Sequence, residues 1–392
     1  MTNLKRRTAL ALCAGLLAVA APASAAEPIR LSLPPPAGPY PVGTTELHLV
    51  DRSRIDPWGP GGPRELMISV WYPARAAHGP ATRHLAPEVA ADYERTAAVV
   101  GVRPGVADFA GTRTHARDGA SVLPGSRPVV LYSPGGGESR ALGTTLAEDL
   151  VSHGFVVVTV DHTYASPVRF PDRMEYPAHG VDMARMMRER ALDTGFVLDQ
   201  LEVLHSGGNP DAAHRALPAG LGRTLDLSRV GMFGHSMGGF TAAEAMLGDR
   251  RIDAGANLDG SMDPASGQAS ARGADRPFLL MGGGTSAGAP HTHRHAADWA
   301  AFWANSTGWK RDVHLPTAEH GSFTDAQVLV PQIGRRITLP SEEVAAAIGT
   351  IDPRRSVAAQ RDYLAAFFAL HLRGWPTDLF DRPSHPDVRL VP

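Results

Sequence analysis

From residue 128 onward, short apolar runs alternate with longer stretches in which apolar residues recur at helical spacing. The short runs predict buried strands at residues 129–132, 155–160, 230–233, 254–258, 278–281 and 312–315. The longer stretches predict helices at residues 142–151, 181–205 and 295–303, and a further helix that ends at residue 246. Strands that alternate with helices need crossover connections, which favour a mostly parallel sheet with helices on both faces. We therefore predict an α/β fold.

The last helix has the clearest pattern in the chain. Leu364, Phe367 and Phe368 repeat at helical spacing and predict an apolar face. Ser356 is the expected N-cap, and Gly374 is expected to end the helix.

The first third of the chain has a different pattern. Two runs at 46–50 and 66–71 are separated by a loop rich in Gly and Pro, and they predict an antiparallel hairpin. Residues 76–127 are polar and loop-rich, with one helix expected near 88–100. A stretch of this length inside a compact domain is usually a functional cover or disordered. We interpret it as a lid-like insertion.

The first 25 residues have the pattern of an export signal. Three basic residues precede an apolar stretch at 8–21, and Ala23-Ser24-Ala25 supplies the small residues of a cleavage site. The apolar stretch is short for a bilayer span, so an uncleaved anchor is the weaker alternative. The pair Arg6-Arg7 leaves twin-arginine export open. We expect a secreted protein, extracellular or periplasmic, with a single domain over residues 26–392.

Composition narrows the chemistry that the chain can perform. The single cysteine, Cys13, lies in the expected signal, so the processed chain has no disulfide, thiol nucleophile or thiolate metal site. The formal charge is −2, and it becomes −5 once the three basic residues of the signal are removed. Such a charge gives no indication of nucleic acid as a partner. No other apolar run is long enough to span a membrane.

Candidate chemistry begins at residues 234–239, which read Gly-His-Ser-Met-Gly-Gly and follow the strand predicted at 230–233. A serine with glycines at positions minus two and plus two, between a strand and a helix, is the sequence form of a nucleophile elbow. The serine sits in a strained turn, where larger flanking side chains would collide with the backbone. Ser236 is therefore the candidate nucleophile, at the carboxyl end of a central strand.

A serine nucleophile needs a base that takes its proton and an acid that orients the base, in the chain order Ser, Asp or Glu, His. Asp259 directly follows the strand at 254–258, and His320 lies in the loop after the last predicted strand. Asp253 precedes its strand and Asp263 lies further into the loop, so both fit the acid less well. A simple turn former before glycine is the alternative role of Asp259. We predict that Asp259 and His320 complete a triad with the elbow serine.

Other histidines fit the base less well. His314 lies within a strand, His162 precedes the elbow, and the side chain of His235 should point away from the cleft. These positions leave His320 as the expected base.

Residues 290–295 contain alternating histidines, namely His291, His293 and His295. Alternate histidines on extended backbone can ligate a metal, although no cysteine is near. We interpret the cluster as a polar loop at the rim of the site, with a metal site as the alternative. We expect no metal and no cofactor.

The tetrahedral intermediate of such a reaction needs two backbone N–H donors for its oxyanion. One is expected from Met237, at the start of the helix after the elbow, where the helix dipole favours negative charge. The other is expected from residues 133–137, Ser-Pro-Gly-Gly-Gly, because glycines let the backbone approach a substrate closely. A plain flexible turn is the alternative reading of this loop.

With these residues placed, the chain resembles the platelet-activating factor acetylhydrolase family of α/β-hydrolases, the plasma and type II group with its bacterial relatives. Besides the elbow, the acid and the base, the matching segments are 38–43, 70–74, 131–137, 152–155 and 196–201. The resemblance implies Ser236, Asp259 and His320 as the triad, and Gly136 and Met237 as the oxyanion donors. Pro134 stands where family members often have a histidine.

The sequence therefore predicts a secreted, metal-independent serine ester hydrolase that works through an acyl-enzyme. The resemblance implies a platelet-activating factor acetylhydrolase-like phospholipase A2 or a carboxylesterase, with a small-molecule or lipid ester as substrate. A lipase or cutinase-like polyesterase acting on non-phospholipid esters is the alternative, and a catalytically silent binding protein is a remote one. Contact with a lipid surface would be transient.

Overall fold

The computed structural model describes residues 27–284 and 289–392. The predicted export signal at residues 1–25 lies outside the described residues. Within the two described ranges, no helix has the length and apolar character needed to cross a membrane.

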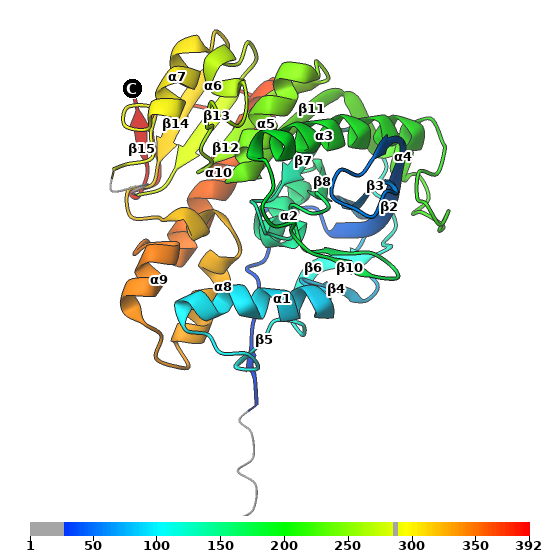
Figure 1. Cartoon of the computed structure of the whole chain (residues 1–392), viewed down its shortest axis with the longest axis horizontal. Helices are drawn as coiled ribbons and strands as arrows, with labels where there is room; N and C mark the ends of the chain where they lie inside the picture. Colours follow the sequence, from blue (N-terminus) through cyan, green and yellow to red (C-terminus); the bar gives the residue numbers. More distant parts are fainter. Residues whose placement is uncertain (1–26, 285–288) are drawn as a thin grey trace, which may run out of the picture.

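An eleven-stranded sheet forms the centre of the described chain (Figure 1). From edge to edge its strands are β15 (Arg389–Val391), β14 (Lys310–His314), β13 (Phe278–Gly282), β12 (Ile252–Leu258), β11 (Leu225–His235), β7 (Arg127–Ser133), β8 (Val156–Asp161), β3 (Pro63–Pro73), β2 (Val42–Ile55), β6 (Arg113–Asp118) and β4 (Ala81–Arg83). All neighbouring pairs from β14 to β8 are parallel, whereas each edge contains antiparallel pairs. The predicted α/β architecture is confirmed, and β11 lies next to β7, the middle strand of the sheet.

Helices cover both faces of this sheet (Figure 1). One face carries α3 (Met183–His205), α4 (Leu221–Thr224), α5 (Met237–Gly248), α6 (Ala269–Arg272) and α7 (Ala297–Asn305), and the other carries α2 (Thr144–Ser152) and α10 (Pro353–Arg373). Along β7, Val129 and Leu131 pack in the first core, while Val130 and Tyr132 pack in the second. This alternation follows because successive side chains of a strand point to opposite faces.

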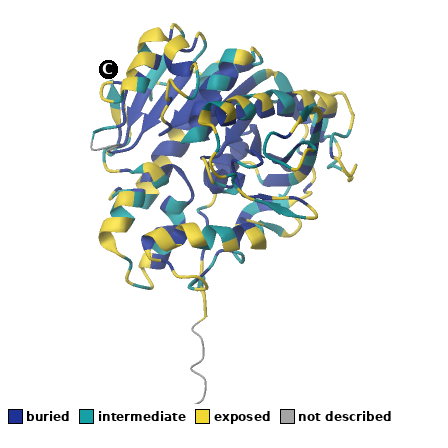
Figure 2. Cartoon of the chain, viewed as in Figure 1, coloured by how far each residue is buried: buried dark blue, intermediate teal, exposed yellow. Residues whose placement is uncertain are grey.

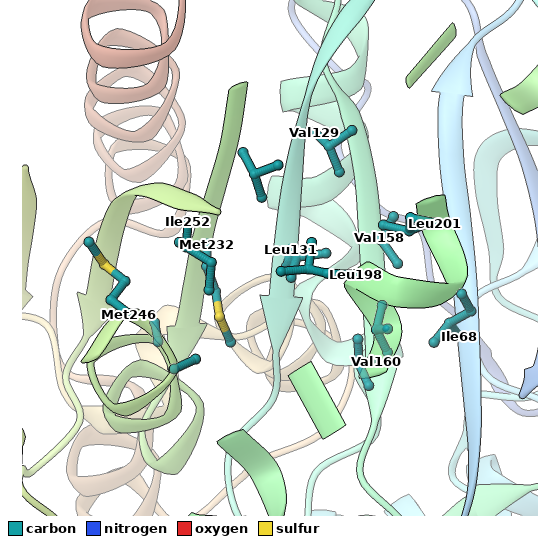
Figure 3. Close-up of a cluster of buried hydrophobic side chains, with 14 of the residues drawn as sticks. Ile68, Val129, Leu131, Val158, Val160, Leu198, Leu201, Met232, Met246 and Ile252 are labelled. Atoms are coloured by element: carbon teal, nitrogen blue, oxygen red, sulfur yellow. The ribbon is translucent and has the colours of Figure 1, made fainter. Parts of the chain in front are cut away.

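The core between the sheet and helices α3 and α5 is shown in Figure 3. Leu198 and Leu201 of α3 belong to the same buried cluster as Leu131 and Val158 of the sheet. Each fully buried aliphatic side chain contributes roughly 1.5–3 kcal/mol to folding. In Figure 2 the sheet is accordingly dark blue, and the outward helix faces are yellow. The core holds the central strands rigidly, so their carboxyl ends can position a site.

The last predicted helix is confirmed as α10, but its N-cap is not Ser356. Asp352 caps the helix, because its carboxylate accepts the N–H groups of Arg354 and Arg355 and proline occupies the first helical position. Ser356 is buried one turn inside the helix. Gly374 ends α10 in a left-handed conformation, with φ of 69°, as predicted.

The predicted hairpin is confirmed as β2 and β3, which pair antiparallel over a longer span than the pattern indicated. The helix expected near residues 88–100 is α1 (Pro87–Ala97), which continues as a 3₁₀ turn over Ala98–Val100. The expectation that residues 76–127 are otherwise loop was wrong for β4 and β6. Both strands extend the central sheet, because β6 pairs with β2 even though its sequence is mostly polar.

A third, smaller core lies beside the main sheet. Helix α1 packs there with α8 (Ala326–Gly334) and α9 (Ser341–Ile348), which lie side by side in Figure 1. The short strands outside the central sheet are β1 (Ile29–Arg30) with β5 (Ala107–Asp108), and β9 (Val168–Arg169) with β10 (Met174–Glu175). The third core therefore joins the insertion to the segment that follows β14.

Candidate active site

Ser236 occupies the turn between β11 and α5, as the glycine spacing predicts. Its φ of 54° and ψ of −125° are strained for a residue with a side chain. A Cβ on Gly234 would lie 2.2 Å from the carbonyl carbon of Gly238, and a Cβ on Gly238 would lie 1.9 Å from the Ser133 oxygen. No side chain fits at either position, so the tight turn requires both glycines.

Asp259 is the first residue after β12, and its turn is tied to the elbow. Its φ of 56° is again in the left-handed region. The Ser236 N–H donates to the Leu258 oxygen at 2.8 Å, and the Gly260 N–H donates to the side-chain oxygen of Asn257 at 2.7 Å. The first bond links the ends of β11 and β12 and the second braces the turn that carries Asp259, so the serine and the acid are fixed relative to one another.

The Asp259 carboxylate receives three hydrogen bonds. Oδ2 lies 2.6 Å from Nδ1 of His320, while Oδ1 lies 2.8 Å from Nδ1 of His291 and accepts the Gly283 N–H at 2.8 Å. Burial alone would raise the pKa of Asp259, but the hydrogen bonds from His291 and His320 lower it well below its usual range. The carboxylate is therefore ionised at neutral pH.

His320 begins a 3₁₀ turn, His320–Phe323, in the loop after β14. Its side chain is 54% exposed, in contrast to the buried acid behind it. A hollow of about 430 Å³ is lined by Ser236, Met237, Asp259, His291 and His320. The structure thus brings the predicted nucleophile, acid and base to one cavity.

A second hollow, of about 300 Å³, lies on another side of His320. Most of its wall is apolar and comes from α1, α8, α9 and the 3₁₀ turn after α1, including Val89, Ala97 and Ala347. Gly137 and Glu138 of the loop after β7 complete it. His320 is common to both hollows, so a ligand at the base has two spaces beside it, of which the second is the more apolar.

His235, next to the serine, does not line the first hollow, in agreement with its predicted direction. It is fully buried, with Nδ1 2.9 Å from the Glu138 carboxylate and Nε2 3.0 Å from the backbone oxygen of His320. Both partners are acceptors, so both ring nitrogens donate and the ring is a cation. Burial would lower the pKa of His235, but the charge of Glu138 raises it. No pattern in the sequence indicates this ion pair, which ties the loop of His320 to the loop after β7.

The glycine-rich loop after β7 places Gly136 beside Met237. The N–H of Gly135 donates to Glu138 at 2.8 Å, and the N–H of Gly137 donates to the Ala165 oxygen at 2.7 Å. Gly136 between them is exposed, and a Cβ there would lie 2.9 Å from the terminal methyl of Met237. The two residues predicted as oxyanion donors are therefore neighbours.

The alternating histidines do not form the polar rim that the sequence suggested. His291 and His293 are buried, and each is bonded through Nδ1 to a different carboxylate, Asp259 and Asp312. His295 instead contacts the hydroxyl of Thr292. Within residues 27–284 and 289–392, no three His, Cys, Asp or Glu side chains converge as a metal ion would need.

His162, which precedes the elbow in the sequence, belongs to a separate buried group. Its Nε2 lies 3.0 Å from the Ser133 hydroxyl, and its Nδ1 lies 3.0 Å from the Asp193 carboxylate. We call Ser133, His162 and Asp193 the interior trio. Arg64 and Arg190 flank it, with Arg64 bonded to Asp193 and Arg190 bonded to Ser133.

The chain is similar to known esterases and acetylhydrolases. A family model described as platelet-activating factor acetylhydrolase, isoform II, matches residues 28–170. The chain is 27% identical over 389 residues to the "Probable 1-alkyl-2-acetylglycerophosphocholine esterase" of Arthroderma benhamiae, covering 92% of this chain and 94% of that protein. It is 26% identical over 158 residues to the platelet-activating factor acetylhydrolase of Cavia porcellus, covering 35% of this chain and 36% of that protein.

Among solved structures, the chain is similar to the ferulic acid esterase from Streptomyces cinnamoneus. The two are 40% identical, with a TM-score of 0.76, covering 92% of this chain and 99% of that chain. This similarity confirms the predicted α/β-hydrolase fold over nearly the whole described chain.

Proposed function

The chain belongs to the platelet-activating factor acetylhydrolase family of α/β-hydrolases and is a carboxylic ester hydrolase, and we propose that Ser236, His320 and Asp259 carry out its reaction. We call these three residues the proposed triad. The observation that carries the proposal is the 2.6 Å bond between His320 Nδ1 and Asp259, beside the hollow that Ser236 also lines.

In the proposed reaction, His320 Nε2 takes the proton of the Ser236 hydroxyl while the serine oxygen attacks the ester carbonyl. The ionised Asp259 holds His320 with its proton on Nδ1 and stabilises the imidazolium that forms. His320 then gives its proton to the departing alcohol. A water molecule, activated by the same histidine, hydrolyses the acyl-enzyme and frees the serine.

The negative oxygen of the tetrahedral intermediate needs fixed donors. We assign this role to the backbone N–H groups of Gly136 and Met237. Their proximity, the exposure of Gly136 and the position of Met237 at the start of α5 support the assignment. The helix dipole of α5 adds positive potential at this point.

The second hollow supports an ester substrate with a short apolar group. Its largely apolar lining and volume of about 300 Å³ suit a short or oxidised acyl chain better than a long one. We propose a lipid ester of the platelet-activating factor type, or a simple carboxylic ester, as the substrate. Lipase or polyesterase activity stays the alternative.

A second candidate substrate is an ester of an aromatic acid. The 40% identity to a ferulic acid esterase over nearly its whole length favours it. An aromatic acyl group would also fit the apolar character of the second hollow.

We also propose that residues 1–25 direct secretion and that residues 76–127 act as a partial cover of the site. The contribution of α1 to the wall of the second hollow supports the cover. The test of this proposal is to compare activity after exchange of residues 76–127 with the corresponding stretch of a relative.

A fluorophosphonate probe tests the enzyme directly. It should label the wild-type protein at Ser236 and should not label Ser236→Ala. A panel of p-nitrophenyl esters of rising chain length, a 1-alkyl-2-acetyl phospholipid and a ferulate ester then separates the substrate classes. Folded wild-type protein that stays unlabelled and cleaves none of these esters would instead support a silent binding protein.

A further inference from the structure

We propose that His291 is a positioning residue for ester hydrolysis, which holds the Asp259 carboxylate in the orientation that directs His320 toward Ser236. The inference deepens the proposed function and rests on it. It gives the acid a second histidine partner, from a loop that the sequence placed at the rim of the site.

The contacts of Asp259 show how the carboxylate is held. Oδ2 faces His320 at 2.6 Å, and Oδ1 is held by His291 at 2.8 Å and by the Gly283 N–H at 2.8 Å. The terminal torsion of an aspartate is soft, so a carboxylate bound on one side only would turn and offer His320 a range of directions. Bonds on both oxygens fix the plane of the group.

His291 is itself anchored firmly enough to do this. It is 2% exposed and stacks on the indole of Trp299, with ring centroids 4.0 Å apart. The same indole donates through Nε1 to the Gly260 oxygen at 2.8 Å. Trp299 therefore contacts both the positioning histidine and the turn that carries the acid.

The electrostatics agree with this role. Because a carboxylate can only accept, Nδ1 of His291 donates to Asp259. This bond is the largest of the contributions that lower the pKa of Asp259, ahead of the bond from His320. It therefore helps to keep the acid ionised when His320 becomes an imidazolium.

His293 offers a matched control two residues later. It is also buried, its Nδ1 lies 2.7 Å from Asp312, and its ring stacks on Trp303 with centroids 3.9 Å apart. The loop, the tryptophan-bearing helix and the type of bond are the same. The carboxylate is the difference that matters, because Asp312 belongs to strand β14 and lines neither hollow next to His320.

The test compares His291→Phe, His291→Asn and His293→Phe in the full-length protein, using p-nitrophenyl acetate. His291→Phe keeps a ring against Trp299 but removes the donor, so kcat should fall about 10- to 100-fold with KM within about twofold of wild type. His291→Asn places an amide N–H near the Nδ1 position and should recover most of kcat. His293→Phe should keep kcat within about twofold, whatever its effect on the thermal midpoint.

A wild-type kcat in His291→Phe, or an equal loss in His293→Phe, would overturn the inference. If His291→Phe does not fold, His291→Asn is compared with His291→Gln, whose amide reaches the Nε2 position instead; equal kcat values would count against a specific donor at Nδ1. Full activity of Ser236→Ala would show that the proposed triad itself is wrong, which separates the two failures.

Discussion

The proposed triad and the interior trio contain the same three residue types but differ in everything around them. The interior trio forms a continuous chain, with 3.0 Å between the Ser133 hydroxyl and His162 and 3.0 Å between His162 and Asp193. All three of its side chains are buried, with no more than 1% of each residue exposed. His320 of the proposed triad is instead 54% exposed beside two hollows.

Charge separates the two groups as well. Burial and the nearby Arg190 cation lower the pKa of His162 to about 4, so this ring is neutral at pH 7. Arg190 also donates to the Ser133 hydroxyl and to the Pro134 oxygen, which leaves the hydroxyl proton directed at His162. The interior trio therefore stabilises the base of the glycine-rich loop.

A hydrogen-bonded Ser, His and Asp do not by themselves make a nucleophile. Ser133 lies at the end of β7 in ordinary strand conformation, without a positive φ. Ser236 has the strained turn, the helix N-terminus behind it and a cavity in front. Access for the ester and donors for the oxyanion are what the interior trio lacks.

The largest expected effect comes from exchanging each serine for alanine. Ser236→Ala should lower kcat about 10⁴-fold or more and abolish fluorophosphonate labelling, with the fold unchanged. Ser133→Ala should still be labelled at Ser236 but lose about 1–3 kcal/mol of unfolding free energy, because buried partners lose a hydrogen bond. Ester hydrolysis measures the change in kcat, and urea denaturation measures the change in unfolding free energy. Labelling at Ser133 in Ser236→Ala would erase the distinction.

Exchange of each aspartate for asparagine should likewise lower activity in the proposed triad and stability in the interior trio. Asp259→Asn should lower kcat about 10³- to 10⁴-fold with little change in stability, because the amide cannot hold His320 in the required tautomer. Asp193→Asn should cost about 3–5 kcal/mol of stability, because Arg54 and the buried Arg64 both lose an ionised partner and Arg64 keeps only the Asp56 carboxylate. Steady-state kinetics measure kcat of both variants, and denaturant unfolding measures their stability. A near-normal kcat in Asp259→Asn would contradict the assignment of Asp259 as the acid.

Acidification should destabilise the protein through the histidine of the interior trio. His162 has a folded pKa of about 4 against about 6.5 unfolded, so between these values the unfolded chain binds the proton and stability rises with pH. Acidification from pH 6.5 to 4 should therefore remove roughly 3 kcal/mol through this group. His371, whose burial also lowers its pKa to about 4, adds to the loss with the same sign.

Urea unfolding between pH 7 and pH 4 measures this slope. His371→Phe should make the slope shallower while leaving the contribution of His162. A stability that stays constant or increases toward pH 4 would contradict the neutral state of the buried ring.

The smallest expected effect concerns the apolar hollow, which adjoins only the proposed triad. Ala347→Phe should narrow that hollow and change the preference between a two-carbon and an eight-carbon p-nitrophenyl ester about three- to tenfold. The stability of the protein should change little, because Ala347 is only partly buried. Ratios of kcat/KM across the ester series give the answer; an unchanged ratio would show that the ester does not use this space.

Much of the fold followed from local patterns in the sequence. The apolar runs that became β7, β8, β12 and β13 are buried on both faces, so their composition indicates parallel strands. The polar strand β6 carries no such signal, since its place depends on pairing with β2. Ser356 looked like an N-cap because the competing cap, Asp352, stands only four residues earlier.

In the site, too, local patterns predict some features and miss those that depend on contacts between distant segments. Chain order and strand ends predict that Ser236, Asp259 and His320 meet at one edge of the sheet. The contacts of His291 with Asp259 and of His235 with Glu138 join loops that are far apart in the sequence, and no local pattern encodes such pairings. The sequence did place the histidine cluster near the site, but it could not indicate that each ring takes a different carboxylate.

The third core has a consequence for how this protein can diversify. Its buried side chains are distinct from those of the two cores that hold the sheet, yet they form much of the wall of the apolar hollow. Mutations there can reshape the space beside His320 without disturbing the strands that fix Ser236 and Asp259. Natural drift or laboratory selection for new ester preferences therefore has a region in which variation is tolerated, while the chemistry stays in place.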